Sequence, residues 1–323
     1  SISKMELSRH TMMVGYKNAV SFLNTSIYRH LELYFMVMAH VHDKNGRLSL
    51  TKDYFSLDQS EKMCVSYQLG QGLTKAVAER YFDVPWTVHV KKMKSDGNRF
   101  NKGSGIKRII DSDMKDGKEP DLVGYDYNGK LHVFEAKGSS AQKPQNSNIQ
   151  KAINQVSYCN SMTDLCGKTD YFTTRNACIF NFSPLFHGYI IDPPMENENI
   201  ENYSGLLCCL YNYYYEFLKN EKSRFKTIEV FGQKWNGYIF SSGNEKYFWG
   251  VNSLCKEFIQ NTYASSAVND TSHLSTQYQE ENYMLQVRRV LEFFSEQNYF
   301  NYNNDDFVSV GKDGYIICDL SHI

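Results

Sequence analysis

Residues 119–140 read EPDLVGYDYNGKLHVFEAKGSS and hold the strongest structural pattern in the chain. Two runs of alternating apolar residues flank Asn128-Gly129, a pair that is typical of the turn in a β-hairpin. Such a hairpin would bring Asp121, Glu135 and Lys137 together at its open end. Two carboxylates and an ammonium group are costly to bury and add nothing to a structural hairpin. The stretch therefore predicts an active site of the metal-dependent hydrolase kind.

The pairing register of this hairpin decides whether the two carboxylates can meet. A two-residue turn would place Asp121 opposite Ala136, so that Asp121 and Glu135 would lie on different faces. A three-residue loop over 127–129, with Gly129 in the left-handed conformation, instead places Asp121 directly opposite Glu135, with Cβ atoms about 5 Å apart. We predict the second arrangement.

The composition is that of an ordinary soluble globular protein. The chain has 323 residues, of which 41% are hydrophobic and 22% are charged, which suits one large or two moderate domains. The net charge of −1 gives no overall signal for nucleic acid, so any such footprint must be local. There is no apolar run of about 18 residues, no secretory pattern at the N-terminus and no C-x-x-C pair among the eight cysteines. We expect a cytoplasmic protein with reduced thiols that does not engage a membrane.

A long helix is predicted before the hairpin. Asp58 and Glu61 have the spacing of a capping box, and apolar residues follow at helical spacing as far as Tyr81. Glu79 lies in the last turn, four residues after Lys75. Glu79 either forms a surface pair with Lys75 or is a third acid directed at the hairpin site, and the sequence leaves both open. Residues 86–93 alternate as a strand.

The stretch between this strand and the hairpin is strongly basic and contains three glycines. It could be an ordinary solvated loop, but its position beside the acidic hairpin favours contact with phosphates. The candidate residues are Lys91, Lys92, Lys94, Arg99, Lys102, Lys107 and Arg108.

Three chain segments are predicted. Residues 1–57 form an extension packed on the core, in which 28–42 is a buried helix or, less favoured, a strand. The core, 58–194, continues after the hairpin with a helix over 146–162 and strands over 174–182 and 187–194.

Pro193-Pro194 marks the best domain boundary in the sequence. Residues 195–323 are expected to form an α+β region with helices over 201–222, 252–263 and 277–297, short strands between them and a last strand over 314–320. A mobile loop is expected over 264–276. This region is expected to recognise a target, bind a partner protein or form a homodimer.

The predicted order of elements is αβββαβ, with a mixed central sheet flanked by helices. In this order, and in its motifs, the chain resembles the PD-(D/E)xK nuclease superfamily, which has the restriction-endonuclease-like fold. Pro120-Asp121 corresponds to the PD motif and Glu135-Ala136-Lys137 to the ExK motif. Glu79 falls where the family has an acid on the preceding helix. Gln155, with Lys151, falls on the following helix, and the resemblance covers about residues 58–192.

The resemblance implies Mg²⁺, for which Mn²⁺ can substitute, bound by Asp121, Glu135, the backbone carbonyl of Ala136 and Glu79. Lys137 would orient or deprotonate the attacking water, with Gln155 in support. Ser139 and Lys151 would join the basic stretch in binding nucleic acid. These expectations describe an endonuclease that hydrolyses phosphodiester bonds, most plausibly in DNA, with a restriction or anti-phage role by family analogy. The alternatives are a catalytically silent nucleic-acid-binding or assembly module and an RNase or toxin that uses the same site.

Overall fold

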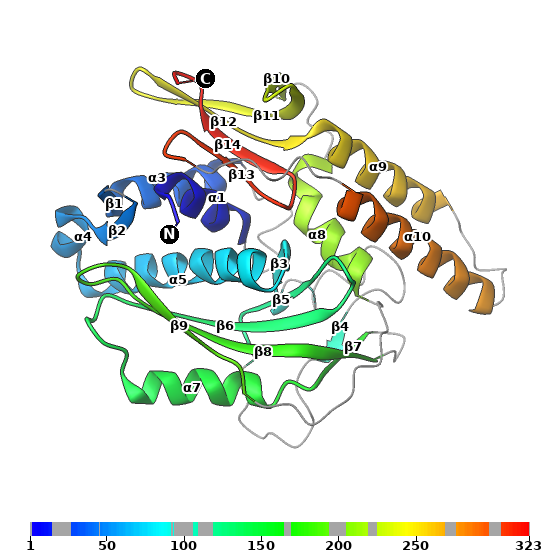
Figure 1. Ribbon diagram of the computed structural model, residues 1–323, viewed down its shortest axis with the longest axis horizontal. Coiled ribbons are helices and arrows are strands. Elements are labelled where there is room, and N and C mark those ends of the chain that lie inside the picture. Colours follow the sequence, from blue (N-terminus) through cyan, green and yellow to red (C-terminus); the bar gives the residue numbers. More distant parts are fainter. Residues whose placement is uncertain are drawn as a thin grey trace.

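The computed structural model describes residues 2–14, 27–44, 46–91, 93, 106–108, 119–164, 169–193, 205–218, 225–268, 276–296 and 305–322. The protein is a mixed α/β structure (Figure 1) in which a curled mixed sheet and a second, antiparallel sheet are joined by helices. Within the described residues, no helix is both long enough and apolar enough to cross a membrane.

The larger sheet carries the hairpin. Its seven strands follow the order β3-β5-β6-β8-β7-β4, and β9 pairs with the far part of β8. Strands β6 and β8 are parallel, and the other pairs are antiparallel. The strands are β3 (Trp86–His89), β4 (Ile106–Arg108), β5 (Leu122–Tyr125), β6 (Leu131–Ser139), β7 (Ser161–Asp164), β8 (Thr169–Asn181) and β9 (His187–Ile191).

The predicted hairpin register is confirmed. Leu122 pairs with Phe134 and Tyr125 with Leu131, so the next pair outwards is Asp121 with Glu135. The loop closes where the Asp126 N–H donates to the Lys130 carbonyl at 3.0 Å. Gly129 has a φ of +74°, the left-handed conformation that this three-residue loop requires.

Two helices cover the faces of this sheet (Figure 1): α5 (Gln59–Tyr81) on one side and α7 (Asn146–Ser157) on the other. The predicted capping box is confirmed, because the Asp58 side chain accepts from the Glu61 N–H and the Glu61 side chain accepts from the Asp58 N–H. Helix α7 ends five residues earlier than predicted, since the chain turns into β7 at Ser161.

Helix α5 lies unusually close to β6. A Cβ on Gly70 would come within 2.9 Å of the Gly138 backbone nitrogen, and a Cβ on Gly138 would collide with the Ser66 carbonyl. Only a pair of glycines allows this approach. Gly70, which weakens α5 as an isolated helix, therefore lets the helix pack against the strand that carries Glu135 and Lys137.

The N-terminal elements pack on α5. They comprise α1 (Lys4–Val14), α3 (Ile27–His40), β1 (Val41–Lys44), β2 (Arg47–Leu50) and α4 (Lys52–Ser56). The helical alternative for 28–42 is confirmed up to His40, and β1 begins at the next residue. Helix α1 lies between α5 and the C-terminal sheet (Figure 1).

The C-terminal region forms the second sheet, in the order β10-β11-β12-β14-β13, with helices beside it. Two details differ from expectation. The three-residue strand β13 was not predicted, and α9 continues to Val268, so 264–268 is helical rather than loop. The elements are α8 (Leu206–Leu218), β10 (Lys226–Val230), β11 (Gln233–Ser242), β12 (Glu245–Asn252), α9 (Ser253–Val268), α10 (Thr276–Glu296), β13 (Val308–Val310) and β14 (Tyr315–Asp319).

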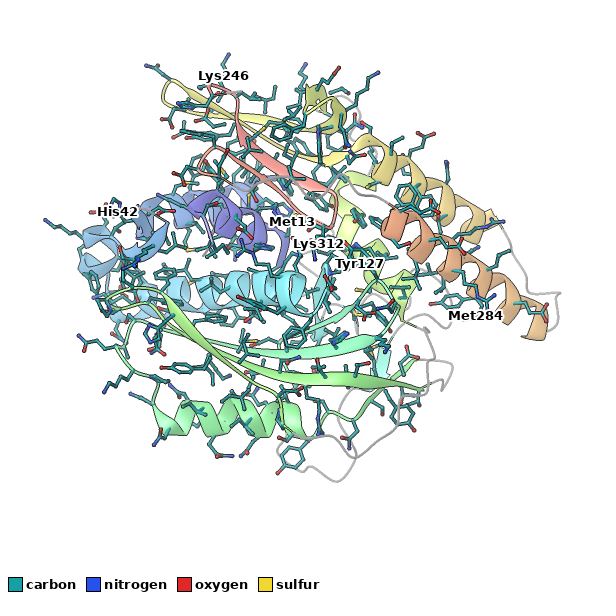
Figure 2. The ribbon with its side chains drawn as sticks, viewed as in Figure 1. Met13, His42, Tyr127, Lys246, Met284 and Lys312 are labelled. Carbon is teal, nitrogen blue, oxygen red and sulfur yellow. The ribbon has the colours of Figure 1, made fainter. Side chains whose placement is uncertain are left out.

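The two sheets are joined through one hydrophobic core. The same buried cluster includes Trp86 of β3, Tyr214 of α8 and Trp249 of β12, and the Trp86 indole N–H donates to the Tyr214 hydroxyl at 3.1 Å. Figure 2 shows Tyr127 and Lys312 together where the two parts meet, and the Tyr127 hydroxyl donates to the Lys312 carbonyl at 2.7 Å. The boundary predicted at 194/195 lies next to residues outside the described ranges, so it stays a prediction.

Candidate active site

Asp121 and Glu135 form the centre of the candidate site. Both are buried, at 8% and 1% exposed, and both lie at the open end of the hairpin, as predicted. The Asp121 N–H donates to Glu135 Oε2 at 3.1 Å, and Asp121 Oδ2 accepts from the Ala136 N–H at 3.3 Å. These reciprocal hydrogen bonds hold the two carboxylates next to each other. Asp121 comes directly before the first residue of β5, and Glu135 lies opposite it within β6.

Lys137 completes the group from the same strand and face as Glu135. Its ammonium donates to Glu135 Oε1, and also to Gln155 Oε1 at 2.9 Å. The Gln155 amide donates in turn to the Glu119 carbonyl at 3.5 Å. Gln155 of α7 therefore joins the β6 lysine to the residue that precedes Pro120-Asp121. The structure brings together four of the five residues that the sequence predicted as catalytic.

The surroundings of Glu135 disfavour the ionised form of its carboxyl group. Burial, together with the nearby charge of Asp121, raises the pKa of the Glu135 carboxyl from 4.5 to about 7, although the Lys137 ammonium acts to lower it. A single lysine is thus not enough to neutralise two buried carboxylates. The site holds excess negative charge, which a bound cation would stabilise.

The oxygen atoms of the site suit a divalent metal ion. Asp121 and Glu135 offer carboxylate oxygens on neighbouring strands, and Ala136 lies between Glu135 and Lys137. These are the hard oxygen ligands that Mg²⁺ prefers when waters complete its shell. Within the part of the chain that the structure describes, no group of three or more His, Cys, Asp or Glu side chains is arranged to hold a metal. The residues fit a site of two carboxylates that relies on water and substrate for its other ligands.

Tyr67 of α5 is a neighbour of the site that the sequence analysis did not single out. The half-buried Tyr67 phenol has a pKa raised by burial and by the charges of Asp121 and Glu135, so it lies within electrostatic reach of both. It follows Ser66, whose carbonyl meets Gly138. The signal that could have revealed Tyr67 is Gly70, which marks where α5 approaches the backbone of β6 closely.

Glu79 lies elsewhere and does not join the other acids, so its prediction as a metal ligand needs correction. It is nine residues beyond Gly70, about 13 Å further along α5. Its carboxylate accepts from Arg9 at 2.9 Å and from the Lys312 N–H at 3.3 Å. Of the two alternatives left open by the sequence, the pair with Lys75 is present, with the Lys75 ammonium 4.0 Å from Glu79 Oε2, but it is buried and not at the surface.

The buried group around Glu79 joins three parts of the chain. Arg9 of α1 also donates to Asp313 Oδ1 at 3.2 Å, and the Lys75 ammonium lies 3.5 Å from Asp313 Oδ2. Although burial acts against it, the charges of Glu79 and Asp313 raise the pKa of the Arg9 guanidinium. The Arg9 cluster (Arg9, Lys75, Glu79 and Asp313) therefore fixes α1, α5 and the β13–β14 turn together.

The predicted nucleic-acid contacts are only partly visible. Lys91 and Lys151 are exposed, and the half-buried Ser139 hydroxyl accepts from the Ala141 N–H at 3.1 Å. Lys107 and Arg108 belong to β4, but their side chains lie outside what the structure describes. Lys92, Lys94, Arg99 and Lys102 also lie outside the described residues.

Comparison with known proteins gave no relative: no family model, curated protein or solved structure matches this chain.

Proposed function

We propose that the protein is a Mg²⁺-dependent endonuclease that hydrolyses phosphodiester bonds in DNA, with a fold of the restriction-endonuclease type. One observation carries this proposal: Asp121 faces Glu135 across the hairpin, with Lys137 on the same face. The chain order α5, β3, β5, β6, α7, β8 supports it, because it is the αβββαβ order of the PD-(D/E)xK nucleases once two short strands are set aside. These are β4 and β7, which pair with each other at one end of the sheet. A restriction or anti-phage role extends the same proposal by analogy alone.

Each residue has a defined part in this chemistry. Asp121 and Glu135, with the Ala136 carbonyl, would hold Mg²⁺, which would supply stabilisation of negative charge on the phosphate and a bound water of lowered pKa. Mn²⁺ would be accepted by the same oxygen ligands. Lys137 orients the attacking water and offsets phosphate charge. Gln155 fixes the Lys137 ammonium and, through the Glu119 carbonyl, the start of the Asp121 strand.

A cleavage assay tests the proposal. Supercoiled plasmid, single-stranded DNA and RNA would be incubated with the protein in Mg²⁺, Mn²⁺ or EDTA. We expect metal-dependent cleavage by the wild type and losses of at least about 100-fold in Asp121→Ala and Lys137→Ala. Asp306→Ala, which changes an exposed acid in the C-terminal region, is the matched control and should cleave like the wild type. Equal activity in all four proteins would disprove the site assignment.

One observation favours a second candidate, a nucleic-acid-binding module that does not cleave. Among the described residues the site has two carboxylates and no third acid, since Glu79 belongs to the Arg9 cluster. Binding of DNA in EDTA at the same affinity as in Mg²⁺, without cleavage under any condition, would support this module. Cleavage of RNA alone would instead assign the site to a ribonuclease.

A further inference from the structure

On the side of the site that faces α5, the Tyr67 hydroxyl is a hydrogen-bond donor to which no part in the reaction has yet been given. Among the residues that the structure describes, Lys137 is the one predicted cation that contacts a site carboxylate, and it is already bonded to Glu135 and Gln155. Lys151 is exposed on α7. A phosphodiester brought to the carboxylates therefore needs further hydrogen-bond donors, and neutral donors would not compete with a cation for Asp121 and Glu135.

Tyr67 is placed to be such a donor. The Ser66 carbonyl lies against Gly138, and Gly70 lies against the Gly138 nitrogen, so this turn of α5 is fixed beside the end of the E-A-K motif. Tyr67 follows directly on the helix and carries its phenol within reach of both carboxylate charges. Those charges and burial raise the pKa of the phenol, so it stays protonated and can donate.

Gln71 lies one turn further along the same row of α5, because residues four apart share a helix face. Gln71 is 1% exposed, and neither its amide nitrogen nor its amide oxygen has a hydrogen-bond partner among the described residues. Leaving a buried amide unpaired is energetically unfavourable, so such groups usually meet a water or another polar group. Its burial keeps Gln71 from touching a substrate directly.

We propose that Tyr67 is a further catalytic residue of this site, that its hydroxyl donates a hydrogen bond to a non-bridging phosphate oxygen of the substrate, and that Gln71 positions the hydroxyl through a bridging water. This inference rests on the proposed nuclease function. It gives α5 a direct part in the reaction through its glycine-packed turn, while its acid at Glu79 holds the fold together.

Tyr67→Phe tests the proposal, because it removes only the hydroxyl. We expect kcat for Mg²⁺-dependent DNA cleavage to fall about 10- to 100-fold, as for a lost hydrogen bond to a charged group. The Mg²⁺ concentration for half-maximal activity should not change, since Tyr67 does not hold the metal. Tyr81→Phe makes the same change on the same helix at a side chain that is 71% exposed, and it should match the wild type.

The role of Gln71 is tested by non-additivity. Gln71→Leu should slow cleavage, but the Tyr67→Phe/Gln71→Leu double variant should be no slower than Tyr67→Phe alone, because Gln71 acts through the hydroxyl. Multiplicative losses would overturn the positioning role. Thermal unfolding of each variant shows that the folded protein is being compared.

The outcomes separate this inference from the proposed function. A wild type that cleaves, with Tyr67→Phe equally active, overturns the role of Tyr67 and leaves the nuclease proposal in place. A wild type that never cleaves overturns both, since the inference rests on the cleavage reaction. A Tyr67→Phe protein that binds DNA more weakly in Ca²⁺ and also cleaves more slowly in Mg²⁺ supports contact with the substrate.

Discussion

The Asp121 backbone N–H donates to the Glu135 carboxylate across the hairpin at 3.1 Å. This contact lies one step beyond the last ladder pair, Leu122 with Phe134, and holds two acids side by side in a buried site. The Asp121 carboxylate returns a hydrogen bond by accepting from the Ala136 N–H. Backbone geometry therefore holds the acids together against their mutual repulsion.

Asp121→Asn should separate function from stability. The asparagine oxygen can still accept from the Ala136 N–H, while the charge that repels Glu135 is lost. We expect DNA cleavage to fall at least about 100-fold and the metal-free melting temperature to stay equal or rise. Cleavage and thermal unfolding measured on the same preparation check this. A large fall in melting temperature would mean that the two carboxylates support the fold.

The contribution of Glu135 to the stability of the metal-free protein should fall as the pH rises from about 4.5 to about 7. The folded state holds the Glu135 proton with a pKa of about 7, against 4.5 for an ordinary glutamate, so between these values the folded state binds more protons than the unfolded state. The stabilisation that Glu135 contributes is fully present below pH 4.5, the pKa of an ordinary glutamate, and is lost above the folded-state pKa of about 7. Unfolding in denaturant from pH 4.5 to 8 measures it.

Two controls identify Glu135 as the source of this pH dependence. Glu135→Gln cannot ionise, so its stability should lack this fall and should exceed that of the wild type at pH 8 by roughly 1–3 kcal/mol. Mg²⁺ should restore stability to the wild type at pH 8 but not to Glu135→Gln. An unchanged pH dependence in Glu135→Gln would assign the effect to another group.

Arg9→Met should be strongly destabilising. Arg9 is fully buried and donates to Glu79, Asp313 and Ser309, so its removal leaves buried carboxylates without their main counter-charge. The expected loss in the free energy of unfolding is about 3–5 kcal/mol. Arg29→Met, which breaks the more exposed pair with Glu32, should cost about 0–1 kcal/mol. Similar losses in the two variants would contradict the importance given to the Arg9 cluster.

Glu79→Gln tests the correction to the predicted site. Because Glu79 accepts from Arg9 and from the Lys312 N–H, losing its charge should lower stability by roughly 1–3 kcal/mol. Metal-dependent cleavage, measured well below the melting temperature, should continue at close to the wild-type rate. A folded Glu79→Gln protein without cleavage activity would return Glu79 to the catalytic group.

Gly138→Ala should disturb the contact between α5 and β6. The added methyl group would collide with the Ser66 carbonyl, and forcing α5 away costs about 1–3 kcal/mol. Cleavage should also fall, because Tyr67 lies on the displaced turn. Ser140→Ala, two residues further along, should change stability by no more than about 0.5 kcal/mol. Equal stabilities would show that the backbone shifts without cost.

The hairpin could be predicted because local and global requirements agreed. The loop at 127–129 needs a left-handed residue at Gly129, and the same register brings Asp121 opposite Glu135. The capping box of α5 was predictable for a similar reason, since Asp58 and Glu61 satisfy one another within a single turn. Contacts that close within a few residues leave a clear pattern in the sequence.

The position of α5 along the sheet could not be predicted from its periodicity. Helical spacing indicates which residues share a face, but not which turn of the helix meets a given strand. The close contact between Gly70 and Gly138 sets which turn of α5 meets β6, and it brings Tyr67 rather than Glu79 within electrostatic reach of the carboxylates. Strands β4 and β13 were missed because three residues are too few for an alternating pattern.

The contact between Arg9 and Asp313 also bears on the order of folding. The two residues are 304 positions apart in the sequence, and they close a buried cluster that includes α5. During synthesis from the N-terminus, Arg9, Lys75 and Glu79 all emerge long before their partner Asp313. The α5 part of the cluster therefore cannot reach its final packing until Asp313 has been synthesised, and we expect it to stay loosely packed until then.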